Sequence, residues 1–310
     1  MVSGYIKKKR FEQLKKPLAN HNTNNLIWLD YINPTKEELK ELSEKLKIDY
    51  SDLILALDES ERPRIDSWKG YSYIIFNAPL YKRHVYTGTI GIYIKKNYVI
   101  TIHKNALKSL SDIKAMAVSN TIRSKAPPGF VHLILSKIVK NFDASLDKME
   151  DFIDIVETDV LKKIEKDYTE IVFPLKRTLI YFRKALKYNT EVLKLLRQGE
   201  IFKKKDLELY EDLYEDARQL IDEEAISRER LTEIVNTHLN TMSTDLNRVM
   251  KSFTVIATLI LLPTLITGLY GMNFEFMPEL HWKYGYLFAL GIMVFSITAM
   301  LLFFKKKKWL

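Results

Sequence analysis

A short polar segment lies between two long apolar stretches near the carboxyl end of this 310-residue chain. It reads YGMNFEFMPEL over residues 270–280 and combines a glycine, a methionine and an uncharged amide with two nearby carboxylates. The Asn273 carboxamide and the Gly271 carbonyl can accept hydrogen bonds from the water shell of a cation. Glu275 and Glu279 would concentrate cations at such a site, although plain solvated loop charge explains them equally well. These residue types therefore indicate recognition of a hydrated cation.

The stretches on either side of this segment have the length and composition of membrane-spanning helices. Residues 252–274 (23 positions) and 284–304 (21 positions) contain no charged side chain, and a helix needs roughly 20 residues to cross a hydrocarbon core. A buried hairpin of a soluble protein is the alternative, but core helices seldom lack charge for so long. Arg248 and Lys251 precede the first stretch, and four lysines, 305–308, follow the second. The positive-inside rule therefore predicts a multi-pass protein of the cell membrane with both termini in the cytoplasm.

The remaining composition excludes several classes of function. The formal charge is +9, but the basic residues alternate with acidic ones or gather at the membrane edge, which favours contact with lipid over nucleic acid. The absence of cysteine excludes disulfides and thiolate metal sites, and six scattered histidines do not indicate a zinc site. No apolar run of signal-peptide type follows the basic N-terminus. We find no catalytic constellation and no Walker-type loop, so we expect neither an enzyme nor ATP as a partner.

The first third of the chain has the pattern of a mixed α/β domain. Runs rich in β-branched and aromatic residues predict strands, and Lys-Lys-Asn before Tyr98 predicts a hairpin turn. Thr35 and Glu38 have the spacing of a capping box, which predicts the start of a helix. The APPGF segment at 126–130 marks the end of the domain. The predicted strands are 26–30, 71–76, 89–94 and 98–102.

Beyond that boundary the apolar residues recur at helical spacing. Phe142, Leu146 and Met149 begin a series that steps by four and three, and the pattern starts again beyond a break near Pro174. A further helix from about Asp206 to Tyr270 would be on the order of 100 Å long. A helix of this length needs other helices to pack against, and symmetric copies of the chain would provide them most directly.

One face of the first apolar stretch differs from the rest of it. Its small and mildly polar side chains recur at steps of three and four, which places them on one stripe of a helix. Close packing between membrane helices explains some of these small residues equally well. The second stretch is apolar nearly all round and is expected to face lipid. The residues expected to line a pathway, in an assembly of several copies, are Asn247, Met250, Thr254, Ala257, Leu261, Thr264 and Gly268.

The sequence also resembles a known family. Residues 270–273, Tyr-Gly-Met-Asn, stand at the outer end of the first of two C-terminal spans, as the signature of the CorA family of magnesium channels does. A Met-Pro-Glu-Leu segment, the second span and a terminal KKKKWL follow in the order typical of that family. The similarity extends back through WLDYINPTKEEL, LDESERPRID, YVITIHK and PLKRTLIYFRKAL. It covers nearly the whole chain.

The resemblance implies a homopentamer with a cytoplasmic α/β domain, a stalk helix that continues into the pore-lining span, and a peripheral second span. It further implies a selectivity filter of Gly271, Met272 and Asn273, in which the Asn273 side chains bind hydrated Mg²⁺. We expect backbone freedom to be the reason for Gly271, and we expect Met272 to pack against the loop or the second span. Thr264 would add a second ring of hydroxyls, and Met250 matches the family's apolar constriction.

A second, regulatory metal site is expected in the acidic stretch of residues 206–224, which carries nine carboxylates against one arginine. Like charges that gather where subunits meet repel one another unless a divalent ion bridges them. The resemblance assigns the sensor role to Asp212. Residues 67–70 supply no carboxylate where the family tends to be acidic. A solvated acidic face is the alternative.

The sequence thus predicts an α+β membrane protein that transports divalent cations, chiefly Mg²⁺, driven by the membrane potential and inhibited by cytoplasmic Mg²⁺. Mg²⁺ is both the transported and the regulatory ion, and the partners are further copies of the chain and the bilayer, without nucleic acid or ATP. Transport of Co²⁺, Ni²⁺ or Zn²⁺ is one alternative, and a membrane-anchored coiled-coil sensor or scaffold is another.

The expected domains are the cytoplasmic α/β domain (1–125), the long cytoplasmic helices (126–205), the stalk helix (206–251), the pore-lining span (252–272), the extracytoplasmic loop (273–283), the second span (284–304) and the basic tail (305–310).

Overall fold

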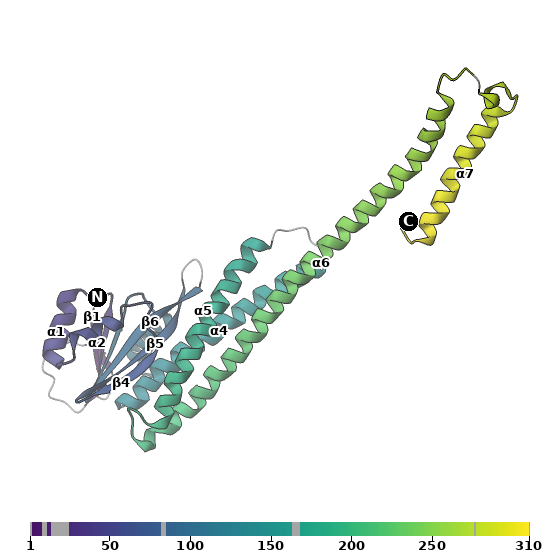
Figure 1. Ribbon diagram of the computed structural model, residues 1–310. Coiled ribbons are helices and arrows are strands. Elements are labelled where there is room, and N and C mark those ends of the chain that lie inside the picture. Colours follow the sequence, from purple (N-terminus) through teal and green to yellow (C-terminus); the bar gives the residue numbers. More distant parts are fainter. Residues whose placement is uncertain are drawn as a thin grey trace. The chain divides into compact units, whose positions relative to one another are not determined.

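The computed structural model describes residues 2–7, 11–13, 25–81, 85–162, 168–275 and 277–309. The chain divides into two compact units, Met1–Ile234 and Val235–Leu310. The first unit contains a β-sheet and long helices, and the second contains two apolar helical segments (Figure 1).

The sheet of the first unit has seven strands in the order β2-β1-β3-β7-β6-β5-β4. Neighbouring strands pair antiparallel, except that β3 and β7 run parallel. The strands are β1 (Val2–Lys7), β2 (Phe11–Gln13), β3 (Ile27–Ile32), β4 (Arg64–Trp68), β5 (Tyr71–Tyr81), β6 (Val85–Lys95) and β7 (Tyr98–His103).

The four strands predicted from the sequence are confirmed as β3, β5, β6 and β7. Strands β5 and β6 are longer than predicted because they pair along their whole length, from Ser72 opposite Ile94 to Tyr81 opposite Val85. The hairpin turn between β6 and β7 is confirmed by Lys96, whose φ is +51°. Strands β1, β2 and β4 are not predicted, because their short, partly charged sequences join the sheet through backbone pairing rather than through an apolar pattern.

Three short helices accompany the sheet: α1 (Lys36–Leu46), α2 (Tyr50–Leu55) and α3 (Lys108–Val118). The start of α1 confirms the predicted capping box. The Glu38 N–H donates to the Thr35 hydroxyl at 3.2 Å, and the Thr35 N–H donates to the Glu38 carboxylate at 2.9 Å. These bonds satisfy two of the backbone donors that a helix N-terminus leaves unpaired.

Strand β3 is buried on both of its faces. Ile27, Leu29 and Tyr31 belong to the core cluster that includes residues of α1 and α2. On the opposite face Trp28 packs against Phe130, with the ring centroids 5.3 Å apart. A strand that is covered on both faces is expected to be an almost continuous apolar run, as β3 is.

Helices α4 (Pro127–Leu161) and α5 (Thr169–Gln198) confirm the long helices predicted after the APPGF segment. Phe142 of α4 and Phe182 of α5 meet edge to face, with ring centroids 4.8 Å apart. The Asn189 side chain holds α5 on β5, because its Oδ1 accepts from the Asn77 N–H and its Nδ2 donates to the Asn77 carbonyl, both at 2.9 Å. Long helices and sheet therefore pack as one unit.

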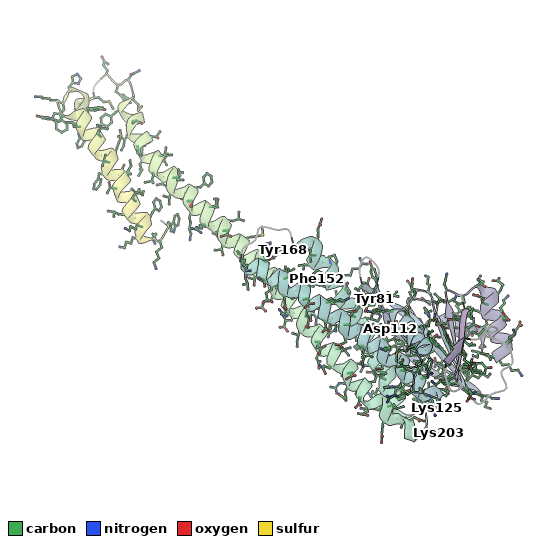
Figure 2. The ribbon with its side chains drawn as sticks, turned by 180° about the vertical axis from the view of Figure 1, so that it is seen from behind. Tyr81, Asp112, Lys125, Phe152, Tyr168 and Lys203 are labelled. Atoms are coloured by element: carbon green, nitrogen blue, oxygen red, sulfur yellow. The ribbon has the colours of Figure 1, made fainter. Side chains whose placement is uncertain are left out.

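The break predicted near Pro174 lies a few residues earlier, between Leu161, where α4 ends, and Thr169, which follows Tyr168 and begins α5 (Figure 2). Pro174 itself does not interrupt the helix. It is the sixth residue of α5, which begins at Thr169. A proline inside a helix removes the hydrogen bond to the carbonyl four residues earlier, here that of Glu170. Glu170 is exposed, so water can hydrogen-bond to that carbonyl and the helix tolerates the proline.

Helix α6 (Glu211–Tyr270) runs without interruption for 60 residues, which confirms that the stalk continues into the first apolar stretch. Its start differs from the prediction, because Lys204–Tyr210 form a 3-10 helix, η1, instead of the first α-helical turns. Tyr210 is buried, and its hydroxyl donates to the Pro128 carbonyl at 2.8 Å. Packing of Tyr210 against α4 therefore determines where the α-helix begins.

In the second unit, a short 3-10 helix, η2 (Pro278–His281), precedes α7 (Gly285–Lys306). Both α7 and the apolar part of α6 are long and apolar enough to cross a membrane, and few of their side chains are buried. Core helices of a soluble protein would bury most of these side chains, so their exposure argues against the buried-hairpin alternative. Trp282 contacts Phe288 at one end of α7 and Trp309 stacks on Phe304 at the other, a placement typical of membrane interfaces.

The expected domain borders remain predictions. The α/β part and α4, α5 and the start of α6 form a single compact unit that extends to Ile234.

Candidate functional site

Along its apolar stretch, α6 has a covered side and an exposed side. Val255 is buried, with 3% of its surface exposed, and Leu259, Leu262 and Ile266 are half-buried at helical steps from it. The residues predicted to line a pathway lie at other positions around the helix. In the single chain all of them are exposed: Asn247, Met250, Thr254, Ala257, Leu261, Thr264 and Gly268. The single chain thus leaves this stripe open, and its pore-lining role stays a prediction.

Two threonines on the stripe have their hydroxyl hydrogens committed to the helix backbone. The Thr254 hydroxyl donates to the Met250 carbonyl, and the Thr264 hydroxyl donates to the Ile260 carbonyl, both at 2.8 Å. A hydroxyl that donates its hydrogen in this way still has lone pairs with which to accept. Both oxygens can therefore accept hydrogen bonds from the water of a hydrated cation.

Gly271 lies directly beyond the end of α6, and its N–H donates to the Thr267 carbonyl at 2.9 Å. Its φ is not positive, since the described glycines with positive φ lie elsewhere in the chain. A positive φ is therefore not the reason for a glycine at this position, and the expected role of its backbone freedom in the filter stays a prediction. A Cβ at this position would lie 3.0 Å from the Thr267 carbonyl oxygen. A side chain here would require the Thr267 carbonyl to shift by a few tenths of an ångström.

The remaining residues of the predicted filter and entrance lie in the loop after α6. Asn273 is exposed, and its carboxamide makes no hydrogen bond to any residue that the structure describes. Met272 is 47% exposed in the single chain, and its expected packing against the loop or the second span stays a prediction. Glu275 is exposed as well. The side chain of Glu279 lies outside the described part of the chain.

The acidic stretch is partly neutralised within the first unit. Glu211 lies 2.7 Å from Arg197. Glu224 is fully buried and lies 3.3 Å from both Arg183 and Arg228. Burial raises the pKa of Glu224, while the charges of Arg228 and Arg183 act in the opposite direction. The pairs Arg197–Glu211 and Arg183–Glu224 join α5 to α6, and the pair Arg228–Glu224 lies within α6. None of them was predicted, because the arginines lie outside the acidic stretch.

Asp212, the predicted sensor, is exposed in the first turn of α6. Burial lowers the pKa of His132 on α4, and the negative charge of Asp212 acts against this shift. Burial raises the pKa of Asp143 on α4, and the charges of Asp147 and Asp216 add to the shift. The packing of α4 on α6 thus brings Asp143 and Asp147 of α4 near Asp216 of α6, a group that was not predicted from the sequence. The four-residue spacing of Asp143 and Asp147, which places them on one helix face, could have indicated part of this group.

Within the described residues, no three His, Asp or Glu side chains lie close enough together to hold a metal ion. The regulatory role of Asp212 therefore stays a prediction.

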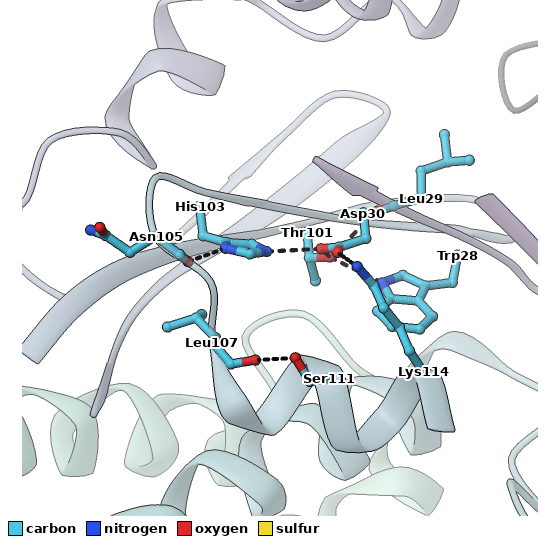
Figure 3. Close-up of polar contacts among 9 residues, drawn as sticks. All are labelled: Trp28, Leu29, Asp30, Thr101, His103, Asn105, Leu107, Ser111 and Lys114. Atoms are coloured by element: carbon cyan, nitrogen blue, oxygen red, sulfur yellow. Dashed lines mark hydrogen bonds and ion pairs between the residues drawn. The ribbon is translucent and has the colours of Figure 1, made fainter. Parts of the chain in front are cut away.

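A buried charge cluster lies between β3, β7 and α3 (Figure 3). Oδ1 of Asp30 accepts from the Thr101 hydroxyl at 2.5 Å and lies 3.1 Å from Nε2 of His103, and Oδ2 lies 2.5 Å from the Lys114 ammonium. Burial by itself raises the pKa of Asp30, but the hydrogen bond and charge of His103, followed by those of Lys114, bring this pKa below its ordinary value. The cluster ties the parallel strand pair to α3 and is a structural element of the first unit.

Two apolar helical segments, each long enough to span a membrane and largely uncovered in the single chain, are typical of a membrane protein. A family model described as CorA-like Mg²⁺ transporter protein matches residues 23–306, and the chain belongs to that family. The resemblance recognised in the sequence is thereby confirmed.

Individual relatives agree with this assignment. The cobalt/magnesium transport protein CorA of Methanocaldococcus jannaschii is 35% identical over 290 residues, which cover 92% of each chain. The protein of the same name from Thermotoga maritima is 30% identical over 261 residues, 82% of this chain and 74% of the relative. The complete structure of the CorA magnesium transporter from Methanocaldococcus jannaschii matches with a TM-score of 0.91 at 31% identity, covering 100% of this chain and 99% of that one. The α+β membrane fold predicted from the sequence is confirmed.

Proposed function

We propose that this protein conducts divalent cations, chiefly Mg²⁺, across the cell membrane through an axial pathway between copies of the chain. The observation that carries the proposal is the Asn273 carboxamide, which is exposed and without a partner among the described residues, beyond the end of α6. Amide oxygens can bind the water shell of the ion, so that Mg²⁺ need not undergo its slow dehydration. The names of the relatives, magnesium or cobalt/magnesium transport protein, support this cargo.

The pathway would continue along the exposed stripe of α6. Rings of Thr264 and Thr254 hydroxyls would accept from the hydrated ion, since their hydrogens are committed to the backbone. Met250 would form an apolar constriction that can close by losing its water. Two spans per chain cannot enclose such a path, so several copies are required, and five is the number that the family resemblance implies.

The membrane potential supplies the driving force in this proposal. At about 2.3 kcal/mol per charge per 100 mV, a divalent cation gains roughly 4.6 kcal/mol on entry. Both termini lie in the cytoplasm, where residues 305–308 satisfy the positive-inside rule. Cytoplasmic Mg²⁺ would inhibit the flow by bridging Asp212 to carboxylates of a neighbouring chain, and loss of the ion would let the carboxylates repel one another.

The pathway is tested by Mg²⁺ uptake into proteoliposomes that contain a Mg²⁺ indicator and have an inside-negative potential. We expect Asn273→Ala to abolish uptake. His281→Ala, which alters another exposed polar residue near the same loop, should leave uptake close to that of the wild type. Unchanged uptake by Asn273→Ala would show that this carboxamide does not recognise the ion.

The regulatory role of Asp212 is tested separately, by loading the liposomes with increasing Mg²⁺ before uptake. Asp212→Ala should weaken inhibition by internal Mg²⁺. The matched control is Asp222→Ala, which removes another exposed carboxylate of the acidic stretch. If both variants are inhibited like the wild type, Asp212 is not the sensor.

The same uptake assay tests two alternative functions. The names of the Methanocaldococcus jannaschii and Thermotoga maritima relatives include cobalt, and a mechanism based on hydrated ions discriminates weakly among small divalent cations. Uptake should therefore be compared for Mg²⁺, Co²⁺, Ni²⁺ and Zn²⁺. A sensor or scaffold would show no flux of any of these ions in the wild type, a result that would overturn the transport proposal.

A further inference from the structure

A cavity of about 520 Å³ lies in the first unit, between α5, the strands β5 and β6, and the segment before β4. We propose that this cavity binds a nucleoside phosphate, with the base against tyrosine rings and the phosphates on Arg62 and Lys184. The proposal concerns a site separate from the ion pathway, and none of the residues assigned to that pathway lines the cavity.

The aromatic wall of the cavity consists of Tyr86 from β6 and of Tyr181 and Tyr188 from α5. All three side chains are half-buried. The rings of Tyr86 and Tyr181 are tilted by 56° with centroids 6.4 Å apart, and they do not cover each other as a tight stack would. Half-buried rings around a cavity offer a surface on which a planar base can stack.

Two cations at the cavity are available to an anion. Arg62 and Lys184 are both exposed, and neither has a carboxylate partner among the residues that the structure describes. The Arg62 guanidinium lies over the ring of Tyr188, 5.6 Å from its centroid. This contact places the guanidinium beside the aromatic wall, and the planar fork of a guanidinium matches the geometry of phosphate oxygens.

The two carboxylates that line the cavity do not cancel these charges. Glu61 forms an ion pair with Arg64. Glu59 accepts from the Asn105 side chain at 2.9 Å and lies 3.7 Å from Lys104. Each acidic group is thus occupied by a partner of its own, so the positive charge at Arg62 and Lys184 is left for a bound anion.

The cavity is preformed and has the size of a ligand site. Small-molecule sites commonly enclose about 300–1,000 Å³ and combine apolar walls with a few polar groups. Asn77, one of the lining residues, is held by the two hydrogen bonds to Asn189 that join β5 to α5. Leu80 and Ala185 line the cavity and are buried. A ligand would therefore find its walls already in place.

A nucleoside phosphate bound here would act as a ligand and not as an energy source. The expectation that ATP is not a partner rested on the missing Walker-type loop, which is one way of holding phosphates and does not exclude a nucleotide site of another kind. Phosphate oxygens are ligands that Mg²⁺ prefers. The family transports Mg²⁺, and nucleoside phosphates form complexes with this ion. A site for such a complex in the first unit would allow the protein to respond to its concentration.

The test is isothermal titration of the full-length protein in detergent with ATP and, in parallel, with inorganic triphosphate. We expect saturable binding of ATP, at least tenfold weaker binding of inorganic triphosphate, and at least tenfold weaker ATP binding by Lys184→Met and by Tyr188→Leu. The control is Lys187→Met, because Lys187 is an exposed lysine of α5 that does not line the cavity. Size-exclusion chromatography checks that each variant folds, and Arg62→Gln replaces any variant that does not.

The proposal is wrong if the wild type shows no saturable ATP binding at millimolar concentration, or if binding is the same in wild type, Lys184→Met and Arg62→Gln. Equal affinity for inorganic triphosphate would overturn the nucleoside part of the assignment. If ATP does not bind and Lys184→Met instead dissociates the assembly, the cavity receives an acidic segment of a second copy of the chain, and the proposal fails.

Discussion

Oδ1 of Asp30 lies 3.1 Å from Nε2 of His103 in the interior of the first unit, where both side chains are almost completely buried. Nδ1 of the same imidazole lies 2.5 Å from the Asn105 carbonyl, which can only accept, so this nitrogen carries a hydrogen. A carboxylate can only accept, so Nε2 hydrogen-bonds to Asp30 when the ring carries a hydrogen on both nitrogens and is positively charged. Lys114 meets the other carboxylate oxygen from α3. The Asp30 charge is thus compensated from two elements at once.

Asp30→Asn should destabilise the protein by about 3 kcal/mol, because removal of one member of a buried ion pair leaves its partners uncompensated. The measurement is thermal or urea unfolding of the detergent-solubilised protein followed by circular dichroism. A loss below about 0.5 kcal/mol would mean that the cluster contributes little to the stability of the first unit.

Asp30 should also make the free energy of unfolding depend on pH in the acidic range. The pKa of Asp30 is lower in the folded protein than its ordinary value, so its contribution is present above about pH 4 and is lost as the pH falls through the folded pKa. The difference in unfolding free energy between wild type and Asp30→Asn should therefore shrink between about pH 5 and pH 3. A difference that stays constant over this range would contradict the depressed pKa.

Glu224 should behave in the opposite way. Burial raises its pKa in the folded protein, so the buried charge costs stability as the pH rises above the ordinary glutamate value. Arg183 and Arg228 are 48% and 38% exposed, and water can solvate them if the carboxylate is removed. Glu224→Gln should therefore change the unfolding free energy at pH 7 by less than about 1 kcal/mol, whereas Glu224→Ala, which leaves a cavity, should lower it by more. A loss of about 3 kcal/mol in Glu224→Gln would show that the ion pairs are net stabilising.

Thr264→Val is expected to slow Mg²⁺ uptake about fivefold, which corresponds to the loss of one hydrogen bond of about 1 kcal/mol to the passing ion's water. Valine keeps the shape of threonine, so packing is little changed. The control is Thr258→Val, since Thr258 is half-buried in the same apolar stretch and lies off the exposed stripe. The measured quantity is the initial uptake rate into proteoliposomes. Equal rates for the two variants would remove Thr264 from the pathway.

Thr35→Ala should cost about 1 kcal/mol of stability, because it removes the side chain that accepts from the Glu38 N–H. The effect is local to the start of α1, so Mg²⁺ uptake at a temperature well below the unfolding midpoint should be unchanged. Unfolding curves and uptake rates from one preparation test both statements. A large loss of uptake with normal stability would show that α1 takes part in transport.

The sequence alone determined those features that depend on neighbours along the chain. The capping box joins two residues three positions apart, and a span is recognised from one uninterrupted run of uncharged residues. The Gly-Met-Asn segment could be placed because it stands at the carboxyl end of such a run. For the same reason the spans, the four inner strands, the long helices and the family could all be predicted from the sequence.

Tertiary structure decided the features that bring distant residues together. Asp30 and His103 are 73 positions apart, and they meet only because β3 and β7 pair in parallel with α3 packed beside them. The start of α6 at Glu211, after the buried Tyr210, and the grouping of Asp143 with Asp216 likewise follow from the packing of one helix on another. The physical reason is that burial, charge compensation and pKa shifts depend on neighbours in space, which a local pattern of residues does not specify.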